Sequence, residues 1–483
     1  MYIEKIEIPA FRVLRDVVLE FGEGFDPQIF PIGSENGGGK STLLQLIFVL
    51  LHCSADPARH PYLENLLASS VRNLSPSEHL VARLRIRIGE ESRDIEFVSY
   101  GELFLHEKLE TAPLSGFYTA DALEETRAEL RDVETRYARI EAAIARLKKS
   151  VPPGRMDTEV VEVLRREFPG SKFPPDVRRV EAVLVKRGDE VTEEIQTLRR
   201  GIDALSADVE RIASLFISVD CAHITNYTFP VPSGWDTRAF VCRSDGVSYA
   251  MVHELLERAA ASVFLLGPSN QQYLFLGTDA RKALLGTVSS DSELRPQIEY
   301  LNSLDKSEGS MAGFFAYDWL SVDPLLKLFA SARDEDFKNV VKTGRYGSTY
   351  TTLMSEVNGL LLGKKVRPLD DLSGVEFVVV DGEGNETALS PEDLSQGELK
   401  RLMIYAWLRA NHAVDAVVLI DEIEASFHPD WQVGIVRDLQ DWAPKNQYLL
   451  ATHSYELCQA LTPRHVRELK PPLRKGGAGD AAE

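Results

Sequence analysis

Residues 33–42 have the types and the spacing that hold a phosphate group. They read Gly-Ser-Glu-Asn-Gly-Gly-Gly-Lys-Ser-Thr. Glycine leaves the backbone N–H groups free to turn towards phosphate oxygens, and a helix that begins here adds the positive end of its dipole. In the pattern G-x-x-x-x-G-K-[ST], the lysine reaches the β- and γ-phosphates and the next hydroxyl ligates Mg²⁺. Lys40 and Ser41 take these places, so the sequence predicts a nucleotide site.

This glycine-rich loop departs from the pattern at its first glycine, where Ser34 stands after Gly33. A glycine-rich turn with a chance lysine is therefore the alternative. Strand-like residues 2–30 before the loop and a helix-like segment from Thr42 to His52 after it give the order that the motif requires. The residues expected to face the nucleotide are Asn36, Gly37, Gly38, Gly39, Lys40, Ser41 and Thr42.

Two apolar segments near the end of the chain each stop at residues that can act on a phosphate. Residues 416–422, Ala-Val-Val-Leu-Ile-Asp-Glu, read as a buried strand that brings Asp421 to a metal ion. Glu422 could then orient and deprotonate the attacking water. Gln447–Ser454 read as a second apolar strand that ends at His453, which could bond the γ-phosphate and respond to its loss. A structural role is the alternative for this histidine.

The run Leu-Ser-Gln-Gly-Glu at residues 394–398 leads into an amphipathic helix through Leu408. Ser395 and Gly397 at the start of this helix form an anion-binding end. Because the glycine-rich loop already takes the phosphates of its own chain, the expected ligand is the γ-phosphate held by a second subunit. An ordinary capped helix is the alternative, with Ser395 as N-cap and Glu398 completing a capping box.

Apolar residues three and four apart indicate two heptad helices between Thr119 and Phe216. With a turn region between them, they predict an antiparallel coiled-coil arm, and two amphipathic helices lying on the body are the alternative. The turn region holds Pro152, a short helical stretch from 157 to 168 and Phe173, which predicts a small folded tip. The first run is Leu123, Leu130, Val133, Tyr137, Ile140, Ile144 and Leu147, and the second is Val191, Ile195, Leu198, Ile202, Leu205, Val209, Ile212 and Phe216.

The composition is that of a globular protein, with 44% hydrophobic and 8% aromatic residues. The formal net charge of −20 disfavours a sequence-independent DNA-binding body, so any nucleic-acid contact needs a local basic patch. Four cysteines without a C-x-x-C pair suit neither a zinc site nor a disulfide framework, which indicates a reducing cytoplasm. The N-terminus has no signal-peptide layout, and no apolar run is long enough to span a membrane.

The remaining segments complete an expected α/β fold. We expect strands at Thr237–Arg243, Ser262–Leu266 and Val375–Val380, a largely helical stretch over Asp318–Leu361, and a disordered end over residues 476–483. The expected division is an N-terminal part of the head at 1–117, a coiled-coil insertion with its tip at 118–217, the rest of the head with a helical subdomain at 218–390, a C-terminal part of the head at 391–470, and a flexible tail at 471–483.

These motifs, in this order, resemble those of the ABC-type ATPases of the SMC/RecF group. The strongest likeness is to stand-alone bacterial ATPases of the OLD type and to those of anti-phage systems such as Septu and PARIS. Its hallmark is the pattern D-E-x-E-x-x-x-H-P-x-x-Q from Asp421 to Gln432, because transporter and SMC heads typically place an aspartate where this chain has His428. Ile6–Arg12 is also similar to the strand and Phe-Arg start of RecF-like heads. The middle of the chain resembles the group only by architecture.

The resemblance implies an ABC-type P-loop ATPase head, a mixed sheet flanked by helices, with the coiled-coil arm inserted into it. ATP and Mg²⁺ are the implied ligands. The Q-loop glutamine of the family is Gln271 or Gln272 here, after the strand at Ser262–Leu266. Carried over position by position, the family's roles fall on Lys40, Ser41 and Thr42 at the phosphates and the metal, Asp421 at Mg²⁺, Glu422 as the catalytic base, His453 as the switch, and Ser395, Gly397 and Glu398 at the nucleotide of a second subunit.

Three functions follow from this reading. We expect a regulatory ATPase whose ATP-dependent dimers or higher assemblies hold a separate effector, a nuclease or a toxin, in check in anti-phage defence. The effector is expected to be a separate protein because too little chain follows His453 for a fused nuclease domain. A RecF-like clamp ATPase that binds DNA in repair or recombination is the alternative. A transporter motor is disfavoured by the arm and by the His-Pro pair that follows Glu422.

Overall fold

A computed structural model of the chain divides into two compact units. The larger unit comprises Met1–Phe104 and Asp220–Glu483, and the smaller unit is Leu105–Val219. Within the described ranges, no helix is both long and apolar enough to cross a membrane. The structure describes residues 1–22, 24–68, 78–101, 119–149, 158–167, 177–217, 220–231, 234–275, 311, 313–317, 322–380 and 386–470.

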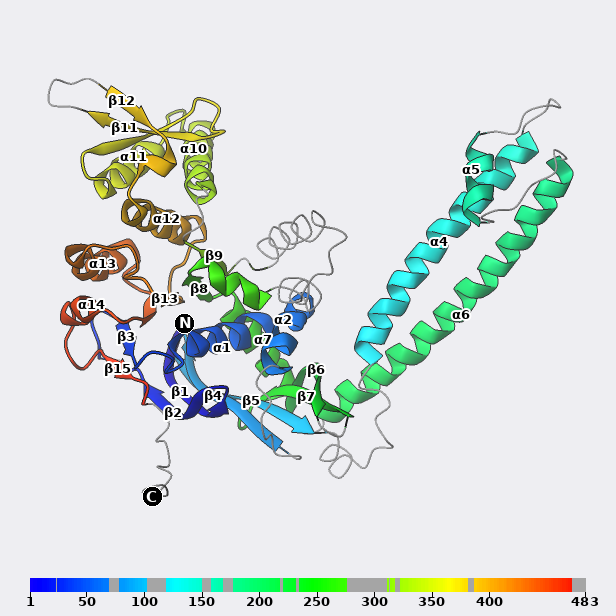
Figure 1. The fold of residues 1–483 in the computed structure, drawn as a ribbon, viewed down its shortest axis with the longest axis horizontal. Coiled ribbons are helices and arrows are strands. Elements are labelled where there is room, and N and C mark those ends of the chain that lie inside the picture. Colours follow the sequence, from blue (N-terminus) through cyan, green and yellow to red (C-terminus); the bar gives the residue numbers. More distant parts are fainter. Residues whose placement is uncertain are drawn as a thin grey trace, which may run out of the picture. The chain divides into compact units, whose positions relative to one another are not determined.

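Six antiparallel strands form the first sheet of the larger unit, in the order β2-β1-β4-β5-β7-β6 (Figure 1). In β2 the side chains of Leu14, Val17 and Leu19 are buried and the residues between them are exposed. One face of the sheet therefore packs on the core, as in most antiparallel sheets. The strands are β1 (Tyr2–Phe11), β2 (Leu14–Glu20), β4 (Glu78–Ile88), β5 (Glu91–Gly101), β6 (Cys221–Val231) and β7 (Gly234–Arg243).

A second sheet of six strands is parallel, in the order β15-β3-β14-β13-β8-β9. Its register aligns Asp421 with Ala451, Ala451 with Ile32, and Ile420 with Leu266. β13 and β14 are buried at every position, as expected for strands covered on both faces. The loops after β3, β8, β13 and β14 therefore meet at one edge of the sheet. The strands are β3 (Ile29–Gly33), β8 (Val263–Gly267), β9 (Phe314–Ala316), β13 (Val417–Asp421), β14 (Gln447–Ala451) and β15 (Arg467–Glu468).

Helix α1 (Lys40–Cys53) lies in the core between the two sheets. From Leu43 onwards all of its residues except Gln45 are buried. Its side chains share one hydrophobic cluster with Ile6 of the antiparallel sheet and Leu419 of the parallel sheet. A helix that is apolar on every side suits this fully buried place. The elements beside it are η1 (Pro57–Arg59), α2 (His60–Ala68) and α7 (Tyr249–Ala260).

Helix α12 (Gln396–Ala410) connects the parallel sheet to a helical subdomain (Figure 1). Ile404 and Trp407 pack in the cluster on the sheet face opposite α1, together with α13 (Pro429–Trp442) and α14 (Tyr455–Gln459). Leu402 and Met403 pack in a separate cluster with the subdomain. Helix α12 thus contributes side chains to two separate hydrophobic cores.

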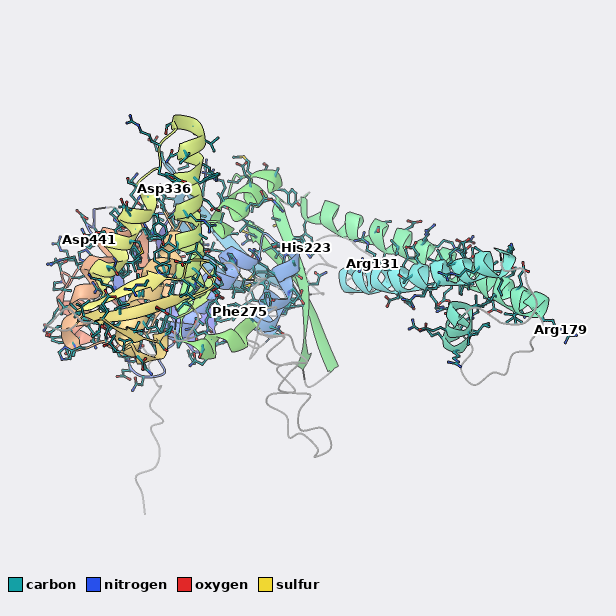
Figure 2. The ribbon with its side chains drawn as sticks, turned by 90° about the horizontal axis from the view of Figure 1, so that it is seen from above. Arg131, Arg179, His223, Phe275, Asp336 and Asp441 are labelled. Carbon is teal, nitrogen blue, oxygen red and sulfur yellow. The ribbon has the colours of Figure 1, made fainter. Side chains whose placement is uncertain are left out.

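The helical subdomain pairs two helices with a three-stranded antiparallel sheet of order β10-β11-β12. Asp336, labelled in Figure 2, accepts hydrogen bonds of 2.9 Å from the backbone N–H groups of Thr349 and Tyr350. These bonds satisfy donors that the first turn of a helix leaves free. The elements are α10 (Asp323–Thr343), α11 (Thr349–Leu360), β10 (Lys364–Pro368), β11 (Val375–Val380), β12 (Glu386–Leu389) and, before α12, η3 (Pro391–Asp393).

The smaller unit is a pair of long helices, α4 (Thr119–Lys149) and α6 (Val177–Ile217), with α5 (Thr158–Glu167) packed on them (Figure 1). Ile140, Leu184 and Val191 lie in its buried seam, and Val160 and Leu164 of α5 join the same cluster. The predicted antiparallel pairing is present. The second helix begins well before the predicted run at Val191, and Val180 and Leu184 extend the buried seam into this earlier part.

Ion pairs between the two long helices have the order of an antiparallel pair. Arg199 pairs with Glu134 at 2.8 Å, and Arg136 pairs with Glu194 at 3.0 Å. The predicted tip falls partly on α5, while Pro152 and Phe173 lie outside the described residues. The tail that was expected to be disordered, residues 476–483, also lies outside them.

Candidate active site

The glycine-rich loop runs from the end of β3 to the start of α1. Gly37 and Gly39 have φ angles of 76° and 93°, in the left-handed region that favours glycine. A Cβ atom at Gly38 would collide with the Ser34 side chain and lie 2.9 Å from the Glu35 carbonyl oxygen. Gly39, the N-cap of α1, has no side chain to cap the helix, so the first N–H groups of α1 are suited to an anion.

Ser34, the departure from the P-loop pattern, lies inside this loop. The Lys40 ammonium donates to the Ser34 hydroxyl at 3.0 Å and to its carbonyl oxygen at 3.2 Å. The serine hydroxyl in turn donates to the Glu35 carbonyl oxygen at 2.8 Å. Asn36 is exposed at the crest of the loop, and Thr42 lies half-buried in the first turn of α1. The serine therefore takes part in the turn that the first glycine of the pattern would make.

Asp421, at the end of β13, is 2% exposed and lies against the start of α1. It is hydrogen-bonded to the Ser41 side chain, and the Gln271 side-chain amide donates to its Oδ2 atom. Gln271 belongs to η2 (Ser269–Phe275), and a Cβ atom at Gly267 would lie 2.8 Å from its side-chain carbon. Of the two candidate glutamines, Gln271 reaches the acid, and the side chain of Gln272 lies outside the described residues.

Charge around Asp421 favours a bound cation. Burial raises the pKa of Asp421 to about 6, the hydrogen bond from Ser41 opposes this rise, and the nearby Glu422 and Glu424 carboxylates add to it. Burial also lowers the pKa of Lys40, against the attraction of the same three acids. One ammonium group faces three carboxylates here, so the cluster carries an excess of negative charge.

Three buried oxygen atoms in this cluster have no hydrogen-bond partner within the described part of the chain. They are Oδ1 of Asp421, Oε1 of Gln271 and Oε2 of Glu424. Unpaired buried oxygens are costly unless a cation or an ordered water binds them. Mg²⁺ prefers such hard oxygen ligands and usually binds through one or two side chains, waters and substrate phosphates. The oxygen atoms of this cluster therefore fit Mg²⁺ in their chemistry.

Glu422 and His453 lie at neighbouring strand ends on the same edge of the sheet. Glu422 has a φ angle of 50°, its N–H donates to the Ala451 carbonyl oxygen at 3.0 Å, and its side chain is exposed. His453 is exposed as well, and its backbone N–H donates to Glu424 Oε1 at 2.6 Å. The third acid of the D-E-x-E pattern, Glu424, thus holds the histidine loop in place.

Gln432, the last residue of the same pattern, also fastens this edge of the sheet. Its side-chain oxygen accepts from the Ser454 hydroxyl at 2.6 Å, and its amide donates to the Phe427 carbonyl oxygen at 2.9 Å. No role was predicted for Glu424 or Gln432. The only sequence signal for both residues was their place in the D-E-x-E-x-x-x-H-P-x-x-Q pattern. Their contacts with His453 and Ser454 form only when the β13–α13 loop is folded.

The Leu394–Glu398 run forms the predicted start of α12. The capping box that we gave as the alternative is present: Glu398 N–H donates to Ser395 Oγ at 3.2 Å, and Ser395 N–H donates to Glu398 Oε2 at 3.0 Å. Lys364 pairs with Glu398 at 2.7 Å. Burial tends to raise the pKa of Glu398, but the hydrogen bonds from Lys364 and Ser395 hold that pKa below its usual range. The Glu398 carboxylate therefore faces the cap of its own helix.

The start of α12 is in contact with the loop after β13. A Cβ atom at Gly397 would lie 2.8 Å from the Ser426 carbonyl oxygen, and the Gln396 side chain accepts from the Ser426 hydroxyl at 3.2 Å. Ser395 is exposed. Among the described residues, no hydrogen bond joins Ser395 or Gly397 to the glycine-rich loop. The structure brings Lys40, Ser41, Gln271, Asp421, Glu422 and His453 to one edge, and leaves Ser395 and Gly397 outside that cluster.

A protein-family model described as "AAA domain, putative AbiEii toxin, Type IV TA system" matches residues 288–459. This range contains the start of α12, and it also contains the paired acids and His453, which lie at the same sheet edge as the glycine-rich loop. In the order and geometry of its motifs, the chain resembles the ABC-type ATPases of the SMC/RecF group. The matched family is an ATPase family, and the glycine-rich loop lies outside the matched range, so the P-loop and the family match are independent observations.

Curated relatives of this chain align over short segments. The Retron Ec83 probable ATPase of Escherichia coli is 30% identical over 97 residues, 18% of this chain and 18% of that protein. The Septu protein PtuA of Bacillus mycoides (strain KBAB4) is 36% identical over 72 residues, 13% of this chain and 10% of that protein. The Retron Vc95 probable ATPase of Vibrio cholerae serotype O1 biovar El Tor is 39% identical over 51 residues, 11% of this chain and 10% of that protein. The chain thus spans less than a fifth of the length of the curated relatives it matches.

Solved structures similar to this chain include two Smc head domains. The Smc head domain with an extended coiled coil of Pyrococcus furiosus, bound to the C-terminal domain of ScpA, has a TM-score of 0.31 and 13% identity, covering 95% of this chain and 91% of that chain. The Smc head domain with a coiled coil and joint of Pyrococcus yayanosii has a TM-score of 0.31 and 14% identity, covering 95% and 93%.

Proposed function

We propose that two copies of this chain close on ATP, each supplying the glycine-rich loop of one site and the α12 start of the other. The observation that supports this is the division of the predicted site residues. Lys40, Asp421 and Glu422 cluster at one edge of the sheet, while Ser395 lies exposed at a helix start outside that cluster. An exposed helix N-terminus suits an anion, and a second subunit can bring one to it.

Each residue of the cluster has a defined part in the proposed reaction. Lys40 and the α1 N-terminus bind the phosphates, and Mg²⁺ on Ser41 and Asp421 would neutralise the charge that develops on them. The exposed Glu422 carboxylate orients the attacking water and accepts its proton. His453, two residues beyond the end of β14, bonds the γ-phosphate and loses that bond on hydrolysis. This proposal makes the chain an ATP hydrolase whose assembly state follows its nucleotide.

The assembly would regulate a separate effector protein, a nuclease or a toxin, in bacterial anti-phage defence. Retron and Septu appear in the names of the relatives, and the matched family description includes a toxin system. All four cysteines are free thiols, in keeping with a reducing cytoplasm. Native mass spectrometry of the complex purified from its own host tests the partner. A co-purifying nuclease or toxin is expected, whereas DNA alone would support the RecF-like alternative.

Glu422→Gln tests the split site, because it removes the proposed base and leaves the phosphate contacts intact. We expect this variant to accumulate as an ATP-bound dimer or higher assembly, measured by light scattering on a sizing column. Lys40→Ala is the matched control, and we expect it to stay unassembled because it lacks the phosphate cation. Equal assembly of Glu422→Gln and wild type in ATP would contradict the proposal.

Mixing two inactive variants separates a shared site from a site within one chain. Lys40→Ala lacks a working phosphate loop, and Ser395→Arg places a large cation at the α12 start. A mixed dimer retains one intact site, so an equal mixture should regain about a quarter of the wild-type turnover if sites act independently. Failure of the mixture to exceed either variant alone, with mixed dimers demonstrated by differential tagging, would rule out the shared site.

A further inference from the structure

Lys400 is a buried lysine, 4% exposed, on the second turn of α12. Its ammonium donates to the Glu422 carbonyl oxygen at 2.9 Å and to the Ala425 carbonyl oxygen at 3.1 Å. It also lies 3.8 Å from the centre of the Tyr317 ring and 5.3 Å from that of Phe427. Buried charges persist where such partners hold them, and this one is bound to the backbone of the proposed catalytic loop.

Glu422, whose carbonyl oxygen accepts this hydrogen bond, has an unusual backbone conformation. Glu422 is a non-glycine residue with a φ angle of 50°, which costs energy unless its surroundings enforce it. Its carbonyl oxygen also accepts from Ala425 N–H at 3.1 Å, and the Tyr317 hydroxyl lies 3.0 Å from it and 2.6 Å from the Asp421 carbonyl oxygen. Donors from three parts of the chain therefore fix the direction in which Glu422 leaves the strand.

We infer that Lys400 is a positioning residue that makes the orientation of the Glu422 carboxylate depend on helix α12. The same helix begins at Ser395, where the proposed function places the γ-phosphate of the other subunit, so this inference rests on that function. Gly397 and Gln396 touch Ser426 of the same loop, so α12 is joined to the loop along its first two turns. A partner's nucleotide that fixes α12 then also fixes the base that acts on this subunit's own ATP.

Lys400→Met tests the inference, because methionine fills a similar volume and removes the ammonium donors. With the Glu422 backbone released, kcat is expected to fall about 10- to 100-fold, as for other groups that orient an active residue, while ATP affinity stays within about twofold. The wild-type rate should rise cooperatively with ATP concentration, and the variant should lose this cooperativity. Lys400→Arg keeps a cation near both carbonyl oxygens and should recover part of kcat.

Arg401→Gln is the matched control, since it removes the neighbouring cation of the same helix. Arg401 pairs with Asp438 of α13 at 2.6 Å, and among the described residues it has no hydrogen bond or ion pair to the Glu422 loop. It should lower the melting temperature but keep kcat and cooperativity. A folded Lys400→Met protein with wild-type kcat and cooperativity would overturn the inference, as would an equal loss in Arg401→Gln.

The Glu422→Gln variant allows the role of Lys400 to be tested separately from the proposed function. In Glu422→Gln, adding Lys400→Met should leave ATP-dependent assembly intact, because the phosphate contacts of both subunits remain. If the double variant fails to assemble while Glu422→Gln assembles, Lys400 builds the interface and the positioning role is wrong. If Glu422→Gln itself does not assemble, the split site fails, and a fall in kcat of Lys400→Met would then support only positioning within one chain.

Discussion

At the scale of single residues, the site depends on how burial and charge act on one carboxyl group. Asp421 is almost fully buried, and this raises its pKa to about 6. Ser41 and Gln271 bind it, yet its Oδ1 atom and Oε1 of Gln271 remain without a hydrogen-bond partner in the described residues. A raised pKa together with unpaired oxygens is the state expected of a metal-binding carboxylate in a buried site.

Asp421→Asn is predicted to stabilise the nucleotide-free protein. A carboxyl group whose pKa is raised by folding costs stability where it is ionised, so the cost is present above about pH 6 and fades as pH falls towards the unfolded value near 4. At pH 8 without Mg²⁺, the free energy of unfolding should rise by about 1–3 kcal/mol in the variant. Urea denaturation between about pH 5 and pH 8 measures this difference, which should shrink at the acid end.

The exposed Asp441 on α13, labelled in Figure 2, supplies the matched control. Asp441→Asn should change the unfolding free energy by no more than about 0.5 kcal/mol at either pH. Added Mg·ATP should stabilise wild type and Asp441→Asn but not Asp421→Asn, because only the last lacks the proposed metal ligand. A destabilised Asp421→Asn at pH 8 would show that the carboxylate is held by attractions that outweigh its burial.

At the scale of elements, each motif gets its geometry from the way its strand or helix ends. β13 and β14 are parallel and in register, so Asp421 and Ala451 are side by side and the residues that follow them can share a ligand. α1 starts without a side-chain cap, while α12 starts with a complete capping box. The arm depends on a different device, a seam of apolar residues between α4 and α6 that is separate from the head's core.

Ile140→Ala is predicted to loosen the arm without affecting nucleotide binding. Ile140 is fully buried in the seam, and removing three of its carbon atoms there should cost about 2–4 kcal/mol of arm stability. Limited proteolysis should cut α4 and α6 faster, while ATP affinity stays unchanged because the two units have separate cores. Glu141→Ala, at the next and exposed position, should leave both unchanged. A loss of ATP affinity in Ile140→Ala would show that the arm and the site are coupled.

At the scale of the whole molecule, charge opposes the proposed assembly. Two chains of net charge −20 repel each other, and salt screens this repulsion over roughly 10 Å at 0.1 M ionic strength. The ATP-dependent dimer of Glu422→Gln should therefore become tighter as ionic strength rises from very low values to the physiological range. Sedimentation velocity over a salt series checks this. Weakening with every addition of salt would instead indicate oppositely charged surfaces at the interface, and the same trend for bound DNA would support the clamp alternative.

The sequence alone determined the features that lie in short, continuous runs. The glycine-rich loop, the apolar strand before Asp421, the start of α12 at Ser395 and the heptads of the arm depend on neighbours close in the chain, so periodicity and motif spacing predicted them. Helix α7 and the three-stranded sheet of the subdomain had weaker patterns, and of the latter only the strand at Val375–Val380 was predicted. Local signals fail there because packing against distant elements decides the structure.

Only the tertiary structure decided which residues act together across long distances in sequence. The sequence left Gln271 as one of two candidates, and the structure shows its amide bonded to Asp421. The partners of Glu424 and Gln432 lie in the loop after β14, which the sequence does not connect to them. Lys400 reads in the sequence as one more charged residue of an amphipathic helix. Lys400 is buried against the Glu422 carbonyl oxygen because α12, the end of β9 and the loop after β13 pack together. The sequence pattern of any one of these segments does not predict how the three pack.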